Sequence, residues 1–208
     1  TPIQRWLFER RIPVIVDGSC DPKVPLPALD VDYHGLCHHA VGTLLRLGHK
    51  RIAYLTVKNS AGGDIASERG FRECFETFSQ YAATPCITHT DNSPERVCAV
   101  LARLFRTSSR PTALVTGRAE MAFTVLTYLI SRGFRIPRDV SVVSRDGAPH
   151  LSYLVPSVAQ YIFNSDAYAK QLSQMTLSHF AGTLRPGQHL LLPDYLKGDS
   201  IGPCPKNQ

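Results

Sequence analysis

The sequence contains no run of about 18 consecutive apolar residues, so no segment of it is expected to span a membrane. Charged residues make up only 19% of its 208 positions, and its 14 glycines and 15 prolines are dispersed, with no low-complexity block. The hydrophobic content of 43% is enough for a packed core, which excludes disordered, collagen-like and coiled-coil proteins. We therefore expect one large or two small globular domains.

The six cysteines show neither a Cys-x-x-Cys pair nor a zinc-finger spacing. Most of them fall at apolar positions of predicted helices and strands, which suits small buried thiols in a reducing compartment. We expect no disulfide framework and a cytoplasmic location. His34, His38 and His39 with Cys37 place histidines four residues apart on a helix, a spacing that can bind zinc, but no third ligand has a diagnostic spacing. An exposed helix face is the preferred interpretation, and no metal is predicted.

Motifs of catalysis and phosphate binding are also missing. The sequence has no Gly-x-Ser-x-Gly elbow, no P-loop and no Gly-x-Gly-x-x-Gly turn, and the Ala61–Asp64 segment is interpreted as a flexible loop. We predict that the chain is not an enzyme and has no cofactor.

The formal net charge of +6 invites a nucleic-acid interpretation, because clustered basic side chains bind phosphates. The longest basic groups are short, they are not interleaved with aromatic residues, and no helix pair has the tight turn of a helix-turn-helix. This chain is therefore not expected to contact DNA itself.

Short apolar runs alternate with amphipathic stretches, which predicts a parallel sheet covered by helices. Ile12–Asp17 is a continuous apolar run, typical of a strand buried on both faces. Further strands are expected at 28–31, 51–57, 86–89, 113–116, 140–143 and 189–192, with helices at 34–47, around Phe71 to Phe78, after Ser93, at 119–132 (Ile130 facing inward) and at 164–183. Asn59–Asp64 and Pro149–Pro156 are expected to be loops.

In open α/β sheets, ligands bind beyond the carboxyl ends of the strands. The residues at those ends are Asp17, the 56–67 segment, His89, Gly117, Arg118 and Asp146. The carboxylates of Asp17 and Asp146 can accept hydrogen bonds from ligand hydroxyls or an amine. A helix-capping or turn role is the alternative for both. Asp64 and Asp91 are interpreted as ordinary loop acids without a role.

Three stretches carry a family resemblance. Leu44–Leu55, with its Leu-Gly-His turn, Pro111–Gly117, and Gly133–Val143 with Asp146 beyond it, resemble the LacI/GalR-type transcriptional regulators. Ile12–Asp17 and Gly70–Arg72 support the resemblance, which runs in family order from about residue 12 to residue 158.

The resemblance implies a periplasmic-binding-protein-like fold of type I, with two α/β lobes, a ligand cleft and a hinge. The N-terminal lobe would be incomplete and comprise residues 1–48 and 160–184, and the C-terminal lobe would comprise residues 49–159 and 185–208. The implied role is the effector-sensing domain of a bacterial regulator, which forms a homodimer and reaches DNA through a domain that this chain does not include.

Departures from the family pattern bear on the ligand. Arg118-Ala119 stands where the family commonly has Asn-Asp, and Ser67 where it has an arginine. Ser144–Gly147 replaces Gly-Phe-Asp-Asp and keeps one acid, Asp146. We predict Asp17, Ser67, Arg118 and Asp146 as ligand-binding residues for a sugar or sugar-like effector. An anionic effector facing Arg118 is one account of the departures, and a degenerate cleft that binds nothing tightly is the other.

Two other classes share this pattern of strands and helices. A solute-binding protein of a transport system is the alternative function, and the Leu-Gly-His-Lys-Arg-Ile stretch and the unpatterned cysteines count against it. A flavodoxin-like enzyme comes third, since no catalytic constellation supports it.

Overall fold

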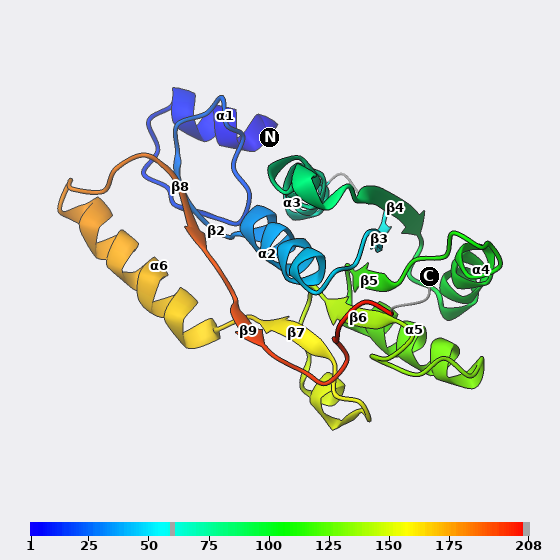
Figure 1. Cartoon of the computed structure of the whole chain (residues 1–208). Coiled ribbons are helices and arrows are strands. Elements are labelled where there is room, and N and C mark those ends of the chain that lie inside the picture. Colours follow the sequence, from blue (N-terminus) through cyan, green and yellow to red (C-terminus); the bar gives the residue numbers. More distant parts are fainter. Residues whose placement is uncertain (59–60, 206–208) are drawn as a thin grey trace. The chain divides into compact units, whose positions relative to one another are not determined.

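The computed structural model describes residues 1–58 and 61–205. The chain divides into two compact units, which are treated separately below (Figure 1). Unit 1 comprises Thr1–Asp32 and Asn164–Pro193, and unit 2 comprises Tyr33–Phe163 and the segment from Asp194 onward. Among the described residues, no helix is long and apolar enough to cross a membrane.

Unit 1 is a small parallel sheet with two helices. Its strand order is β1-β2-β8, with β1 at Val16–Asp17, β2 at Pro27–Val31 and β8 at Gly187–Leu191. The helices are α1 (Pro2–Glu9) and α6 (Ser165–Phe180). The expectation of a doubly buried strand from Ile12 is wrong, because only Val16–Asp17 pair, and they form an edge strand with the single partner β2.

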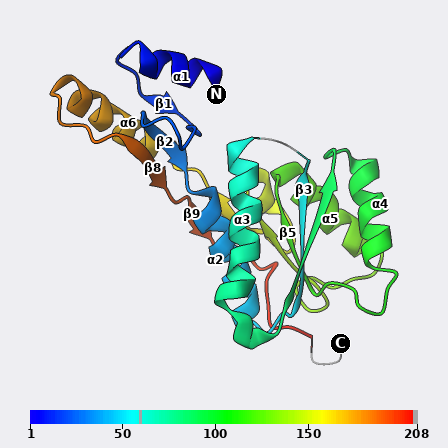
Figure 2. The same cartoon turned by 90° about the horizontal axis from the view of Figure 1, so that it is seen from above.

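Unit 2 contains a six-stranded sheet in the order β4-β3-β5-β6-β7-β9, in which only β9 runs antiparallel to its neighbour. The strands are β3 (Arg51–Val57), β4 (Thr84–Thr90), β5 (Ala113–Thr116), β6 (Ser141–Ser144), β7 (Ala159–Ile162) and β9 (Asp194–Leu196). The α-helices are α2 (Tyr33–Arg46), α3 (Gly62–Thr77), α4 (Pro94–Leu104) and α5 (Ala119–Ser131), with short 3-10 turns at Ser79–Tyr81 and Pro149–Tyr153. Figure 2 shows α2 and α3 on one face of this sheet and α4 and α5 on the other.

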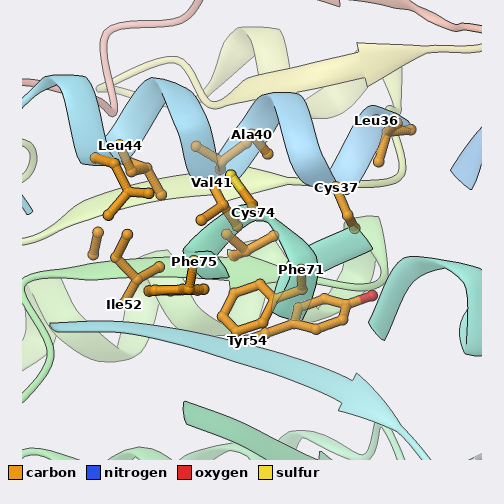
Figure 3. Packing of buried hydrophobic residues seen from close by; sticks show 14 of the residues in the cluster. Leu36, Cys37, Ala40, Val41, Leu44, Ile52, Tyr54, Phe71, Cys74 and Phe75 are labelled. Atoms are coloured by element: carbon orange, nitrogen blue, oxygen red, sulfur yellow. The ribbon is translucent and has the colours of Figure 1, made fainter. Parts of the chain in front are cut away.

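Two apolar clusters hold these layers together. Between α2, α3 and the sheet lie Leu36, Val41, Leu44, Ile52, Tyr54, Phe71 and their neighbours (Figure 3). The Tyr54 and Phe71 rings stack with centroids 5.3 Å apart. The opposite face is filled by side chains of α4 and α5, among them Val97, Leu101, Val125 and Leu129.

The division into units differs from the predicted lobe boundaries. Because α2 packs against α3 and the large sheet, residues 33–48 lie in unit 2, whereas the prediction put them with the N-terminal lobe. Similarly, β7 pairs with β6 and so places residues 160–163 in unit 2. Conversely, β8 pairs with β2, so residues 185–193 lie in unit 1, whereas the prediction put them with the C-terminal lobe. Which lobe of the family's fold each unit represents stays a prediction.

Most predicted elements are present, but β7 and β9 were not predicted, and a 3-10 turn occupies Pro149–Tyr153, which was expected to be a loop. Three further details were wrong. The Ala61–Asp64 segment is not a loop throughout, because α3 begins at Gly62; Asn59 and Ser60 lie outside the described residues. Ile130, expected to face inward, is exposed. The six cysteines are free thiols, but only Cys37 and Cys74 are buried.

The Leu-Gly-His turn has a structural explanation. Gly48 has a φ of +90°, a value that favours glycine, and it delivers His49 into the protein interior. The Nδ1 of His49 lies 2.9 Å from Thr112 Oγ1, and its Nε2 lies 3.0 Å from the carbonyl oxygen of Gly202. This ring therefore ties the C-terminal segment to the amino ends of the strands.

Burial lowers the pKa of His49, although the hydrogen bond to Gly202 opposes this shift. The imidazole of His49 is therefore protonated at a lower pH in the folded protein than in the unfolded chain. As a result, its contribution to stability is present above about pH 6.5 and is lost as the pH falls. We expect the free energy of unfolding to drop by about 1 kcal/mol between pH 7.5 and 5.5 through this residue. Urea denaturation should show a shallower pH dependence for His49→Gln than for the exposed control His150→Gln; equal slopes would contradict this account.

Candidate functional site

Three neighbouring strands of unit 2 end at the same edge of the sheet. β3, β5 and β6 run parallel, so their carboxyl ends lie together. The segments that follow them are the first turns of α3, the Gly117-Arg118 pair before α5, and the Arg145-Asp146 pair after β6. Sequence-distant polar side chains therefore meet at this edge, where α/β proteins bind ligands.

Asp64, in the first turn of α3, is the centre of this group. Its side chain is only 3% exposed. One oxygen, Oδ1, accepts hydrogen bonds from Arg118 Nη1 at 2.9 Å and from Arg145 Nη1 at 2.7 Å. The other oxygen, Oδ2, accepts a bond from Arg118 Nη2 at 2.8 Å. The carboxylate is thus held by two guanidinium groups from two other elements.

Arg145 joins the rest of the group. Its guanidinium, also 3% exposed, donates to Asp146 through Nε at 2.8 Å and through Nη2 at 3.2 Å. Its Nη1 additionally donates to Ser67 Oγ at 3.0 Å, and its centre lies 5.0 Å from the ring centroid of Tyr33. We call Asp64, Arg118, Arg145 and Asp146 the ion-pair network.

The ionisation of this network follows from its contacts. Burial alone would raise the pKa of Asp64, but the hydrogen bonds and charges of Arg118 and Arg145 outweigh burial and hold the pKa below its ordinary value. Burial opposes the charge of Arg145, yet the neighbouring carboxylates raise the pKa of its guanidinium. Asp64 and Arg145 are therefore both charged at neutral pH.

The face of the network that meets solvent is dipolar. Arg118 and Asp146 are its more exposed members, at 24% and 33%, and Arg118 Nη1 lies 3.6 Å from Asp146 Oδ2. A hydrogen-bond donor and an acceptor of opposite charge are thus presented side by side. Such a pair can bind a polar group that both accepts and donates, for example a hydroxyl.

Two buried hydroxyls near the network are poorly paired. Tyr54 OH and Thr56 Oγ1 make no hydrogen bond of good geometry with the described residues, although the Tyr54 hydroxyl lies close to the hydroxyls of Thr56 and Ser67. Gly117 lies against both, since a Cβ at this position would come within 2.9 Å of Thr56 Oγ1 and 3.3 Å of Tyr54 OH. Buried hydroxyls without well-formed hydrogen bonds are unfavourable, so these groups are suited to a water molecule or a polar ligand.

The structure brings together three of the four predicted ligand residues: Ser67, Arg118 and Asp146. Asp17 lies in unit 1, where its carboxylate accepts a hydrogen bond from Tyr168 of α6. The role of all four in ligand binding stays a prediction.

Two residues of the network were missed. Asp64 was interpreted as an ordinary loop acid, and Arg145 was noted only as a departure from the family pattern. The available signal was their position in the chain: Asp64 lies at the start of the helix after β3, and Arg145 lies directly after β6.

The histidines of α2 were interpreted as an exposed helix face. His34 Nε2 lies 2.6 Å from Glu73 Oε2, and His38 Nε2 lies 3.4 Å from Thr77 Oγ1. Within residues 1–58 and 61–205, no group of three or more histidine, cysteine, aspartate or glutamate side chains is placed to hold a metal ion. The contacts of His34 with Glu73 and of His38 with Thr77 tie α2 to α3.

Comparisons with known proteins agree on one family. The profile of the periplasmic binding protein-like domain matches residues 41–201. Catabolite control protein A of Priestia megaterium is 24% identical over 77% of this chain and 50% of its own length. The HTH-type transcriptional repressor PurR of Salmonella paratyphi B is 24% identical over 91% of this chain and 56% of its own length. The chain thus spans about half the length of these curated relatives.

Solved structures show the same fold. A LacI family transcriptional regulator from Bifidobacterium animalis subsp. lactis superposes on this chain with a TM-score of 0.82 at 20% sequence identity. The superposition covers 98% of this chain and 74% of the regulator's chain. A regulatory protein of the LacI family from Chloroflexus aggregans gives 0.82 at 23% identity, covering 97% of this chain and 73% of its own.

The network predicts unequal costs for removing its two arginines. Arg145→Met removes one of the two arginines that bind Asp64 and also the two-bond contact to Asp146, so we expect a loss of about 3 kcal/mol in the free energy of unfolding. Arg118→Met should cost about 1 kcal/mol, because its side chain is partly solvated and Asp64 keeps Arg145. Chemical denaturation measures both values, with the exposed Arg72→Met as a control. Equal losses for the two arginines would contradict the central position of Arg145.

Proposed function

The chain belongs to the periplasmic binding protein-like domain family, and on that premise we propose that it is the effector-sensing domain of a bacterial transcriptional regulator. A small molecule would bind at the carboxyl edge of the unit 2 sheet and alter DNA binding by a domain that is not part of this chain. The observation that carries the proposal is the gathering of four ionisable side chains and two poorly paired buried hydroxyls at that edge. The relatives, which are transcriptional regulators, support the regulatory role.

The chemistry of the edge favours a hydroxylated, sugar-like effector. Arg118 and Asp146 offer a donor and an acceptor side by side, which suits neighbouring hydroxyl groups. The argument for an anionic effector depended on an unpaired Arg118, and this guanidinium makes two hydrogen bonds to Asp64. A neutral polar ligand is therefore preferred over an anionic one.

The alternative, a solute-binding protein of a transport system, shares the fold and has less support. The curated relatives reported above are regulators, and nothing at the edge of the sheet favours transport over sensing. Catalysis is not proposed, because the relatives are regulators and the network contains no nucleophile beside a general base. A regulator of this kind acts on DNA inside the cell, so a cytoplasmic location is part of the proposal.

A homodimer is also part of the proposal, and unit 2 has a surface that fits a second copy of the chain. Tyr153 and Val155, after β6, are 86% and 90% exposed. The ring of Phe123 on α5, also exposed, lies edge-on to His150 at 6.2 Å. Large exposed apolar side chains are typical of protein interfaces, and a two-fold contact would pair this surface with itself.

We expect Asp146→Asn to lose most of the effector response. A ligand at one hundred times its dissociation constant adds about 2.7 kcal/mol to stability, so a thermal-shift screen of sugars, sugar acids, phosphorylated sugars and nucleosides should identify a ligand of the native chain. Asp146→Asn keeps the side-chain shape but removes the charge, and we expect roughly tenfold weaker binding by titration calorimetry. Glu76→Gln, an exposed acid-to-amide change on α3, is the control. A flat response across the whole panel would instead indicate a degenerate site.

The dimer proposal predicts that charge on the apolar surface dissociates the protein. Sedimentation velocity of the native chain should show a dimer, and Tyr153→Asp or Val155→Asp should shift it to a monomer, because burying an unpaired carboxylate is unfavourable. Leu177→Asp changes an exposed apolar residue of α6 and serves as the control. If Leu177→Asp alone dissociates the dimer, the interface lies elsewhere.

A further inference from the structure

A separate groove lies on unit 2 where the edge strand β4 meets α4. It has a volume of about 240 Å³ and is lined by His89 and Thr90 from the end of β4 and by Arg96, Ala99, Val100 and Arg103 from α4. None of these residues belongs to the ion-pair network. The volume is below the range of about 300–1,000 Å³ that holds drug-sized ligands, so the groove suits a small group with its bound waters.

The lining of this groove is basic. It contains two guanidinium groups and an imidazole, and it contains no carboxylate. Arg103 makes no ion pair or side-chain hydrogen bond with any residue that the structure describes. Arg96 Nε lies 4.0 Å from Asp91 Oδ2, and both side chains are well exposed, so this pair is weak. Within the part of the chain that the structure describes, Arg103 is therefore without a carboxylate partner and Arg96 has only a weak one.

A hydroxyl of the lining is left without a partner. Thr90 Oγ1 is buried, and within the described residues it makes no hydrogen bond. An acceptor atom that reaches this hydroxyl would pair with it. His89, the neighbour of Thr90 in β4, has its Nε2 2.7 Å from Glu68 Oε1. Thr90 is thus carried by a strand and the two arginines by a helix.

We propose that this groove binds a small oxyanion of the phosphate class. Arg96 and Arg103 supply the charge and can each donate two hydrogen bonds to one oxyanion. Thr90 supplies a neutral donor, and Ala99 and Val100 form a wall without competing polar groups. Inorganic phosphate and the phosphate group of a phosphomonoester share this chemistry, so both are candidate sources of the ligand.

The test is a titration of the whole chain with inorganic phosphate, at constant ionic strength maintained with chloride, followed by two-dimensional ¹H–¹⁵N NMR. We expect saturable shifts confined to the end of β4 and to α4. Arg103→Gln should weaken binding roughly tenfold because it removes a charged, two-bond donor, and Thr90→Val roughly threefold because it removes one neutral donor. Arg72→Gln removes the same charge from an exposed position of α3 outside the groove and should leave the affinity unchanged.

A second titration distinguishes the two sources. Glycerol 2-phosphate should bind more tightly than inorganic phosphate if the natural ligand is a phosphomonoester, and less tightly if it is the free ion. Chemical shifts that do not saturate, or equal losses of phosphate affinity in Arg103→Gln and Arg72→Gln, would overturn the proposal. Either result would indicate general attraction of phosphate to the basic surface. Circular dichroism melting of each variant shows that it is folded, and failure of phosphate binding leaves the effector proposal at the sheet edge unaffected.

Discussion

The contact between Asp64 and Arg145 is the constraint on which the edge of the large sheet depends. Both side chains are almost removed from water, and each would cost several kcal/mol to bury alone. Their 2.7 Å contact, together with Arg118 and Asp146, compensates this cost only if α3, α5 and the end of β6 keep their positions. A pair of this kind adds little net stability compared with apolar residues, but it is severely destabilising to break, so it specifies one arrangement of these elements.

The same constraint determines what the edge offers to a ligand. The buried members neutralise each other, and the exposed members are one cation and one anion that lie 3.6 Å apart. Arg145 also reaches α3 a second time, because its guanidinium donates to Ser67 Oγ. Ser67, Arg118, Arg145 and Asp146 are thus connected to one another, and the buried hydroxyls of Tyr54 and Thr56 lie close by.

The sequence predicts the helices and strands that have strong periodicity. The prediction fails where contacts between distant parts of the chain determine the structure. β3 and β5 have the expected bounds, and the caps at Gly48 and Ser93 are present. β7 was missed because its four residues follow an irregular segment and carry no strong periodicity of their own. The pairing of β7 with β6 is a tertiary contact that the local sequence does not show. The Asp64–Arg145 pair joins residues 81 positions apart, which no local pattern reveals. Arg118 was predicted at the site, but its pairing with Asp64 was not.

The central claim is that Asp64 and Arg145 act as one unit, and a double-mutant cycle tests it most directly. The free energy of unfolding would be measured for the native chain, Asp64→Ala, Arg145→Met and the double variant. The account predicts that the double variant is less destabilised than the sum of the single variants by at least about 1 kcal/mol, because each single change strands a buried charge that the second change removes. Losses that add to within about 0.5 kcal/mol would contradict it.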